Sequence, residues 1–384
     1  MAIEEIIFVR NNLSPFEIKL AKTLKKKGLK LSSITFYELD KYQKGIFDNE
    51  YYFIHNNMKK SSPFRKILCF PKFYRSLREI KKGIAIGVTS SSNWFVAFVF
   101  WLLRRKTDCR IYFPYDIAFF KYKDYGKHSF FNRFSEKYNF RHNNGVIHKG
   151  PKDELKYLSK EFKALDKPDI QFLPYCDGDL FMEINDRYFQ KKLSTKDGNI
   201  HLVYVGNVVY KNPTHLPFID VFKEIIQQKM YIDAYATNYE QIIDDSEYKK
   251  LQKSKYFTLH KPIYEKKFQM ELSEYDWGLT PAFHKFGKIK KEWTKVSTGS
   301  KMGTYLEAGL PIILNDELIF YADVIEENGF GIVVKPWTAR GIKEKIESIN
   351  YEKMVDSIKI NRKKFTLDAN MDRLINFIKD LADE

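Results

Sequence analysis

Cysteine is scarce in this sequence of 384 residues, and its spacing excludes the usual cysteine chemistry. The three cysteines are Cys69, Cys109 and Cys176. They form neither the close pairs of a zinc site nor the even-numbered framework of a disulfide-rich domain. We therefore expect a reducing compartment.

Long apolar runs are also missing. The longest run, Trp94 to Leu103, is shorter than the roughly 20 residues that a membrane-spanning helix needs. Near the start, Glu4 and Glu5 stand where a secretory signal would carry positive charge. We therefore expect the protein to work in the cytoplasm, either free or peripherally bound to the inner face of the cell membrane.

Acidic residues are deficient in one half of the chain only. The formal net charge is +16, from 65 Lys and Arg against 49 Asp and Glu. Residues 1–178 hold 34 basic and 18 acidic residues, whereas residues 179–384 hold 31 of each. This split predicts two modules, the first facing an anionic partner such as nucleic acid, anionic lipid or an acidic glycan. The alternative is a solvated, lysine-rich surface.

The first half alternates short apolar runs with helical patterns, which is typical of a parallel α/β sheet. One helix is well marked, because Ser14 and Glu17 form a capping box, Pro15 takes the first helical position and Gly28 ends the helix. The predicted strands are Ile6–Val9, Tyr52–Ile54, Ile84–Val88, Arg110–Phe113, Gly145–Ile147 and Ile170–Leu173.

The same alternation restarts after the polar stretch Lys191–Asn199. The predicted strands here are His201–Val205, Met230–Ala234, Tyr256–Leu259, Trp277–Leu279, Pro311–Leu314 and Gly331–Val334, followed by a last helix over about residues 351–384. We therefore predict an α/β protein of two Rossmann-like domains, residues 1–180 and 181–365. The C-terminal helix, about residues 366–384, could pack back on the first domain.

The stretch from Ser297 to Leu314 carries the clearest chemical signal. It reads as a loop of small residues, a short helix, a glycine stop and a buried strand that opens at Pro311. Free backbone N–H groups of Gly299 and Ser300 at the positive end of a helix, with Lys301 in its first turn, suit a phosphate or diphosphate. Taken alone, this could also be an ordinary helix-to-strand turn.

The pattern Lys-x-x-x-Tyr-Leu-x-x-Gly-x-Pro at residues 301–311 resembles the donor-site segment of nucleotide-sugar glycosyltransferases with the GT-B fold. The nearest likeness is to the retaining family 4-like group, with a divergent donor motif. Other segments match in the same order along nearly the whole chain: Val203–Asn207, His260–Pro262, Tyr275–Leu279, Gly329–Ile332, Ile111–Asp116 and Phe172–Asp177.

The resemblance implies two domains that face each other across a cleft, with the nucleotide-sugar on the second and the acceptor on the first. It implies a sugar transfer from a nucleoside diphosphate, with a UDP-sugar favoured, to a glycan or lipid-linked acceptor in cell-surface polysaccharide or glycoconjugate synthesis. Retention of stereochemistry is the implied outcome. The donor-binding candidates are Gly206, Asn207, Lys211, His260, Gly299, Ser300, Lys301 and Thr304.

The sequence departs from the family at two donor positions. Thr304 replaces a usual Glu, so it can hydrogen-bond a ribose hydroxyl but cannot make a bidentate carboxylate contact. Asn207 stands where many relatives carry Arg, so Lys211 or Lys301 must supply the positive charge. A catalytically degenerate protein that binds a partner, or a sugar-nucleotide epimerase of the same fold, are the alternatives.

We expect no metal and no further cofactor, because the sequence shows no Asp-x-Asp-type carboxylate pair at a strand end. The negative charge that develops on the leaving diphosphate must then be stabilised by Lys, Arg and the backbone amides at a helix end. We also expect no nucleic-acid partner, because no helix-turn-helix, RRM signature or zinc finger is present.

Asp116 is the acceptor-side catalytic candidate, as a general base or an orienting group, because it follows an apolar strand. It could instead cap the helix that begins near Ile117. Further acceptor-side candidates are Glu136, which could also have a structural pairing role, and His148, which could also be an ordinary hydrogen-bonded histidine.

Two segments have the composition of membrane-binding elements. Residues 93–106 join aromatic bulk to the basic end Arg104, Arg105 and Lys106, but could also form a buried crossover helix. In residues 64–82, basic residues alternate with Phe, Leu and Tyr. An anionic membrane surface is therefore a candidate partner of the basic half.

Overall fold

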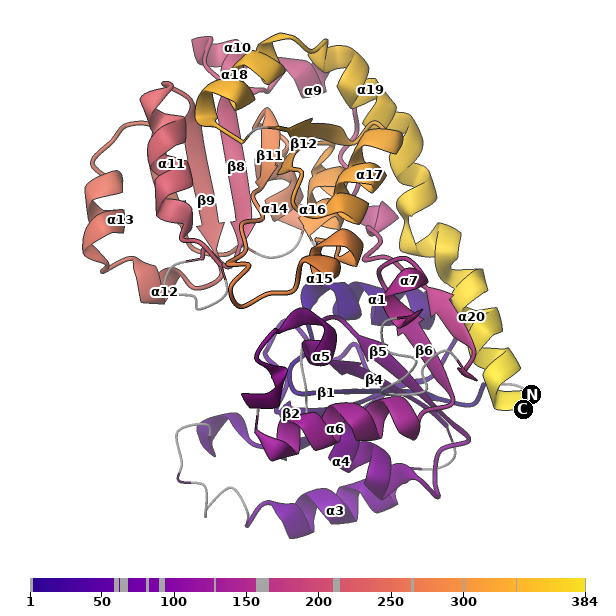
Figure 1. Cartoon of the computed structure of the whole chain (residues 1–384). Coiled ribbons are helices and arrows are strands. Elements are labelled where there is room, and N and C mark those ends of the chain that lie inside the picture. Colours follow the sequence, from indigo (N-terminus) through magenta and orange to yellow (C-terminus); the bar gives the residue numbers. More distant parts are fainter. Residues whose placement is uncertain are drawn as a thin grey trace. The chain divides into compact units, whose positions relative to one another are not determined.

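The computed structural model describes residues 3–58, 62, 68–80, 83–89, 94–127, 129–156, 166–209, 215–263, 266–299, 301–335 and 337–383. The chain divides into two compact units (Figure 1). Unit 1 comprises residues 1–173 and 370–384, and unit 2 comprises residues 174–369. These boundaries, after residues 173 and 369, lie within a few residues of the predicted ones, 180 and 365.

Unit 1 is built on a seven-stranded parallel sheet with the order β3-β2-β1-β4-β5-β6-β7. Ile6 of β1 pairs with Leu31 on one side and Ile84 on the other, so the first strand lies in the middle. Its strands are β1 (Ile6–Arg10), β2 (Leu31–Tyr37), β3 (Asn49–Ile54), β4 (Ile84–Thr89), β5 (Cys109–Pro114), β6 (Gly145–His148) and β7 (Asp169–Gln171).

The longer helices of unit 1 connect these strands. The Ser14–Glu17 capping box and Pro15 at the first turn are confirmed in α1 (Pro15–Lys26). The helices α3 (Phe70–Arg78), α4 (Trp94–Leu103) and α6 (Phe130–Arg141) lie together as one layer (Figure 1). Short helices are α5 (Ala118–Lys121) and α7 (Asp153–Lys156), with the 3₁₀ turns η1 (Asn56–Met58) and η2 (Tyr125–Lys127).

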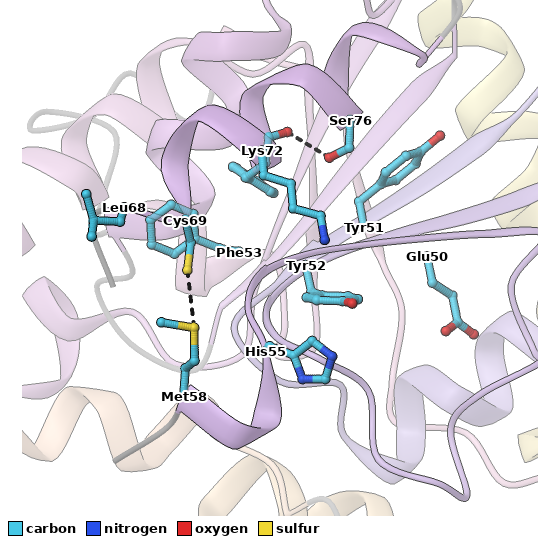
Figure 2. Close-up of a pocket in the computed structure, with 11 residues that line it drawn as sticks. Glu50, Tyr51, Tyr52, Phe53, His55, Met58, Leu68, Cys69, Lys72 and Ser76 are labelled. Atoms are coloured by element: carbon cyan, nitrogen blue, oxygen red, sulfur yellow. Dashed lines mark hydrogen bonds between the residues drawn. The ribbon is translucent and has the colours of Figure 1, made fainter. Parts of the chain in front are cut away.

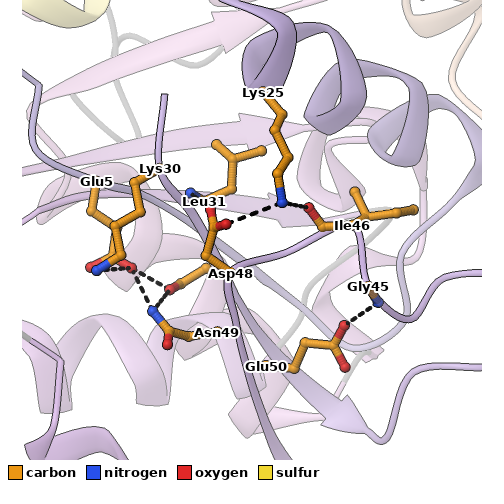
Figure 3. Close-up of polar contacts among 10 residues, drawn as sticks. Glu5, Lys25, Lys30, Leu31, Gly45, Ile46, Asp48, Asn49 and Glu50 are labelled. Atoms are coloured by element: carbon orange, nitrogen blue, oxygen red, sulfur yellow. Dashed lines mark hydrogen bonds and ion pairs between the residues drawn. The ribbon is translucent and has the colours of Figure 1, made fainter. Parts of the chain in front are cut away.

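Strand β2 was not predicted from the sequence. Its buried residues include hydroxyl side chains, which interrupt the apolar pattern of a strand. Ser32 is buried and its hydroxyl donates to the Glu5 carboxylate, which also accepts from Asn49 Nδ2 at 3.2 Å. Beside it, Asp48 accepts the Leu31 N–H at 2.8 Å (Figure 3). These bonds satisfy the Ser32 hydroxyl and the Leu31 N–H at the start of β2, so these polar groups can be buried in the strand.

The chain returns to unit 1 in its last residues. In α20 (Leu367–Asp383), Leu374, Ile378 and Leu381 are buried. Asp372 lies 2.7 Å from Lys27 of α1, and Arg373 donates to the carbonyl of Gln171 at 2.9 Å. The final helix therefore completes the core of unit 1.

Unit 2 repeats the same strand order in a six-stranded parallel sheet, β10-β9-β8-β11-β12-β13. Its strands are β8 (His201–Gly206), β9 (Tyr231–Ala236), β10 (Phe257–His260), β11 (Trp277–Thr280), β12 (Ile312–Asn315) and β13 (Gly331–Val334). The prediction of two α/β units with parallel, Rossmann-like sheets is confirmed.

The helices of unit 2 follow the strands in alternation, as the sequence predicted. After the 3₁₀ turn η4 (Gly178–Leu180), they are α9 (Asp186–Gln190), α10 (Leu193–Asp197), α11 (Phe218–Gln227), α12 (Tyr239–Ile242), α13 (Ser246–Leu251), α14 (Lys266–Leu272), α15 (Lys291–Val296), α16 (Lys301–Ala308), α17 (Ile319–Glu327), α18 (Ala339–Glu347) and α19 (Tyr351–Asn361).

The prediction of one continuous last helix is wrong. The 3₁₀ turn η5 (Arg362–Phe365) separates α19 from α20, and Thr366 is extended (ψ 152°). Thr366 forms a parallel bridge with Cys176, whose N–H donates to the carbonyl of Phe365 at 2.9 Å. Strand-like pairing to the distant Cys176 interrupts the helix, and no local sequence signal reveals it.

Candidate functional site

The candidate site lies at the carboxyl ends of β8, β11 and β12 in unit 2, where a parallel α/β sheet places its ligands. A cavity of about 250 Å³ opens there. Its walls include the side chains of Tyr204, Asn207, His215, Thr280, His284 and Lys301.

The loops around the cavity are held by asparagines from neighbouring strands. Asn315 at the end of β12 accepts the Ala282 N–H at 2.8 Å and donates to the Ala282 carbonyl at 2.7 Å. Asn238 makes the same pair of bonds with Val208, at 2.9 and 3.0 Å. The chain segments that follow β8 and β11 are therefore fixed against the sheet.

Helix α16 delivers Lys301 to the cavity, and Tyr305 anchors that helix. The buried Tyr305 hydroxyl accepts the Val205 N–H at 3.1 Å and donates to the Leu279 carbonyl at 3.0 Å. Its ring fills the space over Gly278, where an added Cβ would lie 2.5 Å away. Because Lys301 and Tyr305 are four residues apart, they share one face of the helix.

The other end of α16 is equally fixed. Glu307 is fully buried, and its carboxylate accepts from the Asp177 N–H at 2.8 Å and from Gln269 Nε2 at 2.9 Å. Arg362 donates to the Leu306 carbonyl at 2.8 Å, near the negative end of the helix. The helix then stops at Gly309, whose φ is +77°.

The Lys301 ammonium has no carboxylate partner among the described residues. It lies 5.0 Å from the centroid of the Tyr204 ring, and its Cε is 3.1 Å from the point where a Cβ of Gly206 would be. Burial lowers the pKa of Lys301 to about 8. A lysine ammonium at the start of a helix, with no carboxylate of the described residues beside it, is suited to bind an anionic ligand.

Two further residues were not singled out in the sequence: His284, which lines the cavity, and Thr298, which precedes the lining residue Gly299. His284 is buried, its Nδ1 lies 2.5 Å from Glu317 Oε1, and its ring is 4.4 Å from that of His215. Since Nδ1 is engaged by Glu317, the other ring nitrogen is available to a ligand. Nearby, the buried hydroxyl of Thr298 has no hydrogen-bond partner in the described part of the chain.

The structure brings several predicted donor residues together and separates others. Asn207, Gly299 and Lys301 line the cavity, and Gly206 packs against the Lys301 side chain. Thr304, one turn further along α16, is partly buried and outside this lining. Lys211 and Ser300 lie outside the described residues.

His260 lies at the carboxyl end of β10, away from the cavity lining. Its Nε2 is 2.5 Å from Asp233 Oδ1, and its ring stacks on Tyr235 with centroids 4.5 Å apart. Both contacts are within the sheet, and they account for the position of this histidine without a ligand.

In unit 1, Asp116 lies at the carboxyl ends of β5 and β6. Its carboxylate is 3.0 Å from Lys121 Nζ and 3.5 Å from Lys149 Nζ. Burial alone would raise the pKa of Asp116, but the two lysines outweigh it and the pKa lies below its usual range. Asp116 is therefore held as a carboxylate.

Glu136, rather than Asp116, caps the short helix α5. Its carboxylate accepts the N–H groups of Ala118 at 2.7 Å and Phe119 at 3.1 Å, and burial raises its pKa. His148 is buried, with Nδ1 2.8 Å from the Gly150 carbonyl and Nε2 3.2 Å from Asp169. Burial lowers the pKa of His148.

Unit 1 has a larger cavity of about 690 Å³, between the edge strand β3 and α3. Its lining is rich in aromatic side chains, including Tyr51, Tyr52 and Phe73, and Lys72 extends from α3 over it (Figure 2). It lies at the edge of the sheet rather than at the carboxyl ends of central strands. The smaller cavity in unit 2 has the better set of anion-binding groups.

Two findings concern metals and membranes. No group of three or more His, Cys, Asp or Glu side chains in the described ranges could hold a metal ion. No helix of the described residues is long and apolar enough to span a bilayer.

The sequence and the structure were compared with known proteins. Residues 203–375 match the family model described as the C-terminal domain of glucosyltransferase 3-like proteins. No curated protein matches the sequence.

Solved glycosyltransferases share the fold over nearly the whole chain. Anabaena HepE, solved with UDP and glucose, has a TM-score of 0.66 at 12% identity and covers 97% of this chain and 99% of its own. A Rickettsia africae glycosyltransferase gives 0.63 at 11% identity, covering 99% of both chains. The lipopolysaccharide outer core galactosyltransferase WaaB gives 0.57 at 12% identity, covering 98% and 99%. The chain therefore has the GT-B glycosyltransferase fold.

Proposed function

We propose that this chain, which has the GT-B fold and whose residues 203–375 match the glucosyltransferase 3-like C-terminal domain model, transfers a sugar from a nucleoside diphosphate to an acceptor hydroxyl. The observation that carries the proposal is the ammonium of Lys301 in the strand-end cavity of unit 2, which has no carboxylate partner in the part of the chain that the structure describes. A UDP-sugar is the proposed donor, and the solved complexes of HepE with UDP and with UDP-glucose support it.

In the proposed reaction, the bond between the anomeric carbon and the diphosphate oxygen breaks, and a bond to the acceptor oxygen forms. The diphosphate leaves with the bonding electron pair, so negative charge grows on it. Lys301 and the amides at the start of α16 stabilise that charge. The proton of the acceptor hydroxyl passes to the departing diphosphate.

Asp116 is proposed to act on the acceptor side as an orienting group. Since Lys121 and Lys149 keep its pKa low, the carboxylate is a weak proton acceptor but a good hydrogen-bond acceptor. It would hold the attacking hydroxyl rather than take its proton. Glu136 and His148 then support the surrounding loops.

For the acceptor, we propose a glycan or a lipid-linked glycan of cell-surface polysaccharide or glycoconjugate synthesis, used at the cytoplasmic side of the membrane. The excess of basic residues in residues 1–178 supports an anionic acceptor or surface. Of the basic segment 64–82, residues 64–67, 81 and 82 lie outside the described residues.

Calorimetric titration with UDP, GDP, ADP and their sugars tests the proposal. We expect one nucleotide to bind, and Lys301→Ala to weaken its binding at least tenfold, which corresponds to losing one charged hydrogen bond of about 1.5–3 kcal/mol. Lys295→Ala, on α15 and outside the cavity lining, is the matched control. Equal affinity in Lys301→Ala and the parent would refute the role of Lys301.

Two alternative functions remain separable by product analysis. A degenerate binding protein would bind the nucleotide without hydrolysing or transferring the sugar. An epimerase would release an epimerised sugar-nucleotide, whereas a transferase would yield a new glycosidic bond on an added acceptor.

A further inference from the structure

The helix layer of unit 1 exposes large aromatic side chains. Exposed fractions are 68% for Phe130, 71% for Phe131 and 55% for Phe134 on α6, and 43% for Trp94 and 47% for Trp101 on α4. On α3, Phe70 and Tyr74 are also exposed. We call these seven residues the aromatic face. Clustered apolar side chains at a surface mark an interaction site.

The rings on α3 and α4 form one continuous surface. Trp94, Phe98 and Trp101 recur at helical spacing along α4, and Phe98 stacks with Trp101 at 6.4 Å between centroids. Phe70 of α3 contacts Phe98 at 5.9 Å. The opposite side of α4, with Phe95, Val99 and Phe100, is buried in the core. The helix is therefore both a crossover helix and a surface element.

On α6, Phe130 and Phe134 stack at 6.1 Å, four residues apart. Tyr138, one turn further, packs against the core cluster that contains Phe95 and Val99 of α4. Helices α6 and α4 lie side by side (Figure 1), and the exposed rings of Phe130, Phe131 and Phe134 add to the aromatic face.

Nearly all charged residues on these helices are basic. Residues 70–79, 94–106 and 130–141 contain two acidic residues, Glu79 and Glu136. Glu136 is buried, with both oxygens bonded to the start of α5. The basic residues in the same ranges are Lys72, Arg75, Arg78, Arg104, Arg105, Lys106, Arg133, Lys137 and Arg141.

Several of these cations lie against the exposed rings. Arg104 lies 4.7 Å from the centroid of the Trp101 ring, and Arg78 lies 5.0 Å from that of Tyr74. Aromatic rings accompanied by cations suit the headgroup region of a bilayer, where aromatic side chains lie among lipid phosphates.

We propose that the aromatic face docks on an anionic phospholipid bilayer. The rings enter the interface between headgroups and acyl chains, and the surrounding Arg and Lys bind lipid phosphates. Charge selects this occupant over a second copy of the chain, because two such faces would set like charges against each other. The proposal names the membrane partner left open by the proposed function, and its failure would leave nucleotide binding untouched.

Tryptophan fluorescence gives a direct test with the parent protein. Trp94 and Trp101 are exposed on the face, whereas Trp277 and Trp293 of unit 2 are buried. Vesicles of phosphatidylglycerol and phosphatidylcholine should shift the emission to the blue, and brominated acyl chains should quench it. Quenching should be lost in the double variant Trp94→Phe, Trp101→Phe. No blue shift and no quenching in the parent would overturn the proposal.

Sedimentation with the same vesicles separates the contribution of the aromatic rings from that of the basic residues. We expect the triple variant Phe130→Ser, Phe131→Ser, Phe134→Ser to reduce vesicle binding at least tenfold. The triple variant Arg75→Glu, Arg104→Glu, Arg105→Glu should abolish it, because it reverses the charges that attract an anionic surface. Binding should fall with added salt in the parent.

Matched controls lie on α19 of unit 2. Ile360 is 65% exposed, and Lys353 and Lys359 are exposed. Ile360→Ser, and separately Lys353→Glu with Lys359→Glu, should leave vesicle binding unchanged. Equal losses in these controls and in the face variants would overturn the proposal, as would equal binding to vesicles of phosphatidylcholine alone. Concentration-dependent dimerisation through the face, without vesicle binding, would assign it to a second copy instead.

Discussion

Burial disfavours the charged form of Lys301, whereas a bound diphosphate would favour it. Its pKa is lowered to about 8, so at pH 7 most molecules carry the ammonium and at pH 9 few do. If only the ammonium binds the diphosphate, affinity should fall about tenfold between pH 7 and pH 9. The phosphate itself ionises near pH 6, below this range. Calorimetric titration across the range measures the change.

Arginine provides the control for this pH dependence, because its guanidinium stays protonated throughout. A Lys301→Arg protein that still binds nucleotide should show a flat profile from pH 7 to pH 9. A flat profile in the parent, or the same slope in both proteins, would mean that another group controls binding.

His284 is predicted to contact the diphosphate through the ring nitrogen that Glu317 leaves available. His284→Asn should weaken UDP binding about tenfold, as expected for one charged hydrogen bond, and should leave uridine binding unchanged. Glu317→Gln should show a smaller loss of the same kind, because it positions His284 through the 2.5 Å contact. Thermal unfolding of each variant controls for stability. Parallel losses for UDP and uridine would contradict a phosphate contact.

The candidate site was partly readable from the sequence. Gly299 and Lys301 stand beside a helix start, which is a local signal, and both line the cavity. His284 and Glu317 meet across 33 residues, from the segments after β11 and β12. Only the folded sheet brings them together, and with no motif between them neither residue could be singled out.

Helix α16 depends on close packing against β11. A Cβ on Gly278 would lie 2.5 Å from the Tyr305 ring, and that ring cannot move without breaking its hydroxyl bonds to β8 and β11. Gly278→Ala should therefore reduce the free energy of unfolding by about 1–3 kcal/mol and weaken nucleotide binding by shifting Lys301. Urea unfolding measures the first effect.

Gly287→Ala is the matched control, since no atom lies within 4 Å of its added Cβ. It should leave the free energy of unfolding within about 0.5 kcal/mol of the parent. Equal stability of the two variants would show that α16 is free to move away from the strand.

Helices and strands with apolar runs were predicted from the sequence. Features that depend on contacts with residues far away in the sequence were not. The strands of unit 2 follow nearly continuous apolar residues, and each predicted strand is present within a few residues. Strand β2 was missed because Glu5 and Asn49 satisfy its buried Ser32. The break at Thr366 was missed because its partner, Cys176, lies in another part of the sequence.

At the scale of the whole molecule, unit 1 is assembled from two separate stretches of chain. Leu381 of α20 fills the space over Gly145, where an added Cβ would lie 2.4 Å from it. Leu381→Ala should reduce the free energy of unfolding by about 2–5 kcal/mol through the cavity it leaves. Ile360→Ala, on the exposed side of α19, should change it by less than about 0.5 kcal/mol. Similar values for both would contradict the packing of α20.

The return of the chain to unit 1 sets an order of events during synthesis. A ribosome makes residues 1–173 before unit 2, but Leu374, Ile378 and Leu381 of unit 1 emerge only after the whole of unit 2. Unit 2 has its complete sequence earlier, although it comes second in the chain. The usual order, in which the N-terminal domain folds first, is thus reversed here for the final packing step. A released chain truncated after residue 369 should therefore resist protease in unit 2, whereas unit 1, which then lacks Leu374, Ile378 and Leu381, should be cleaved.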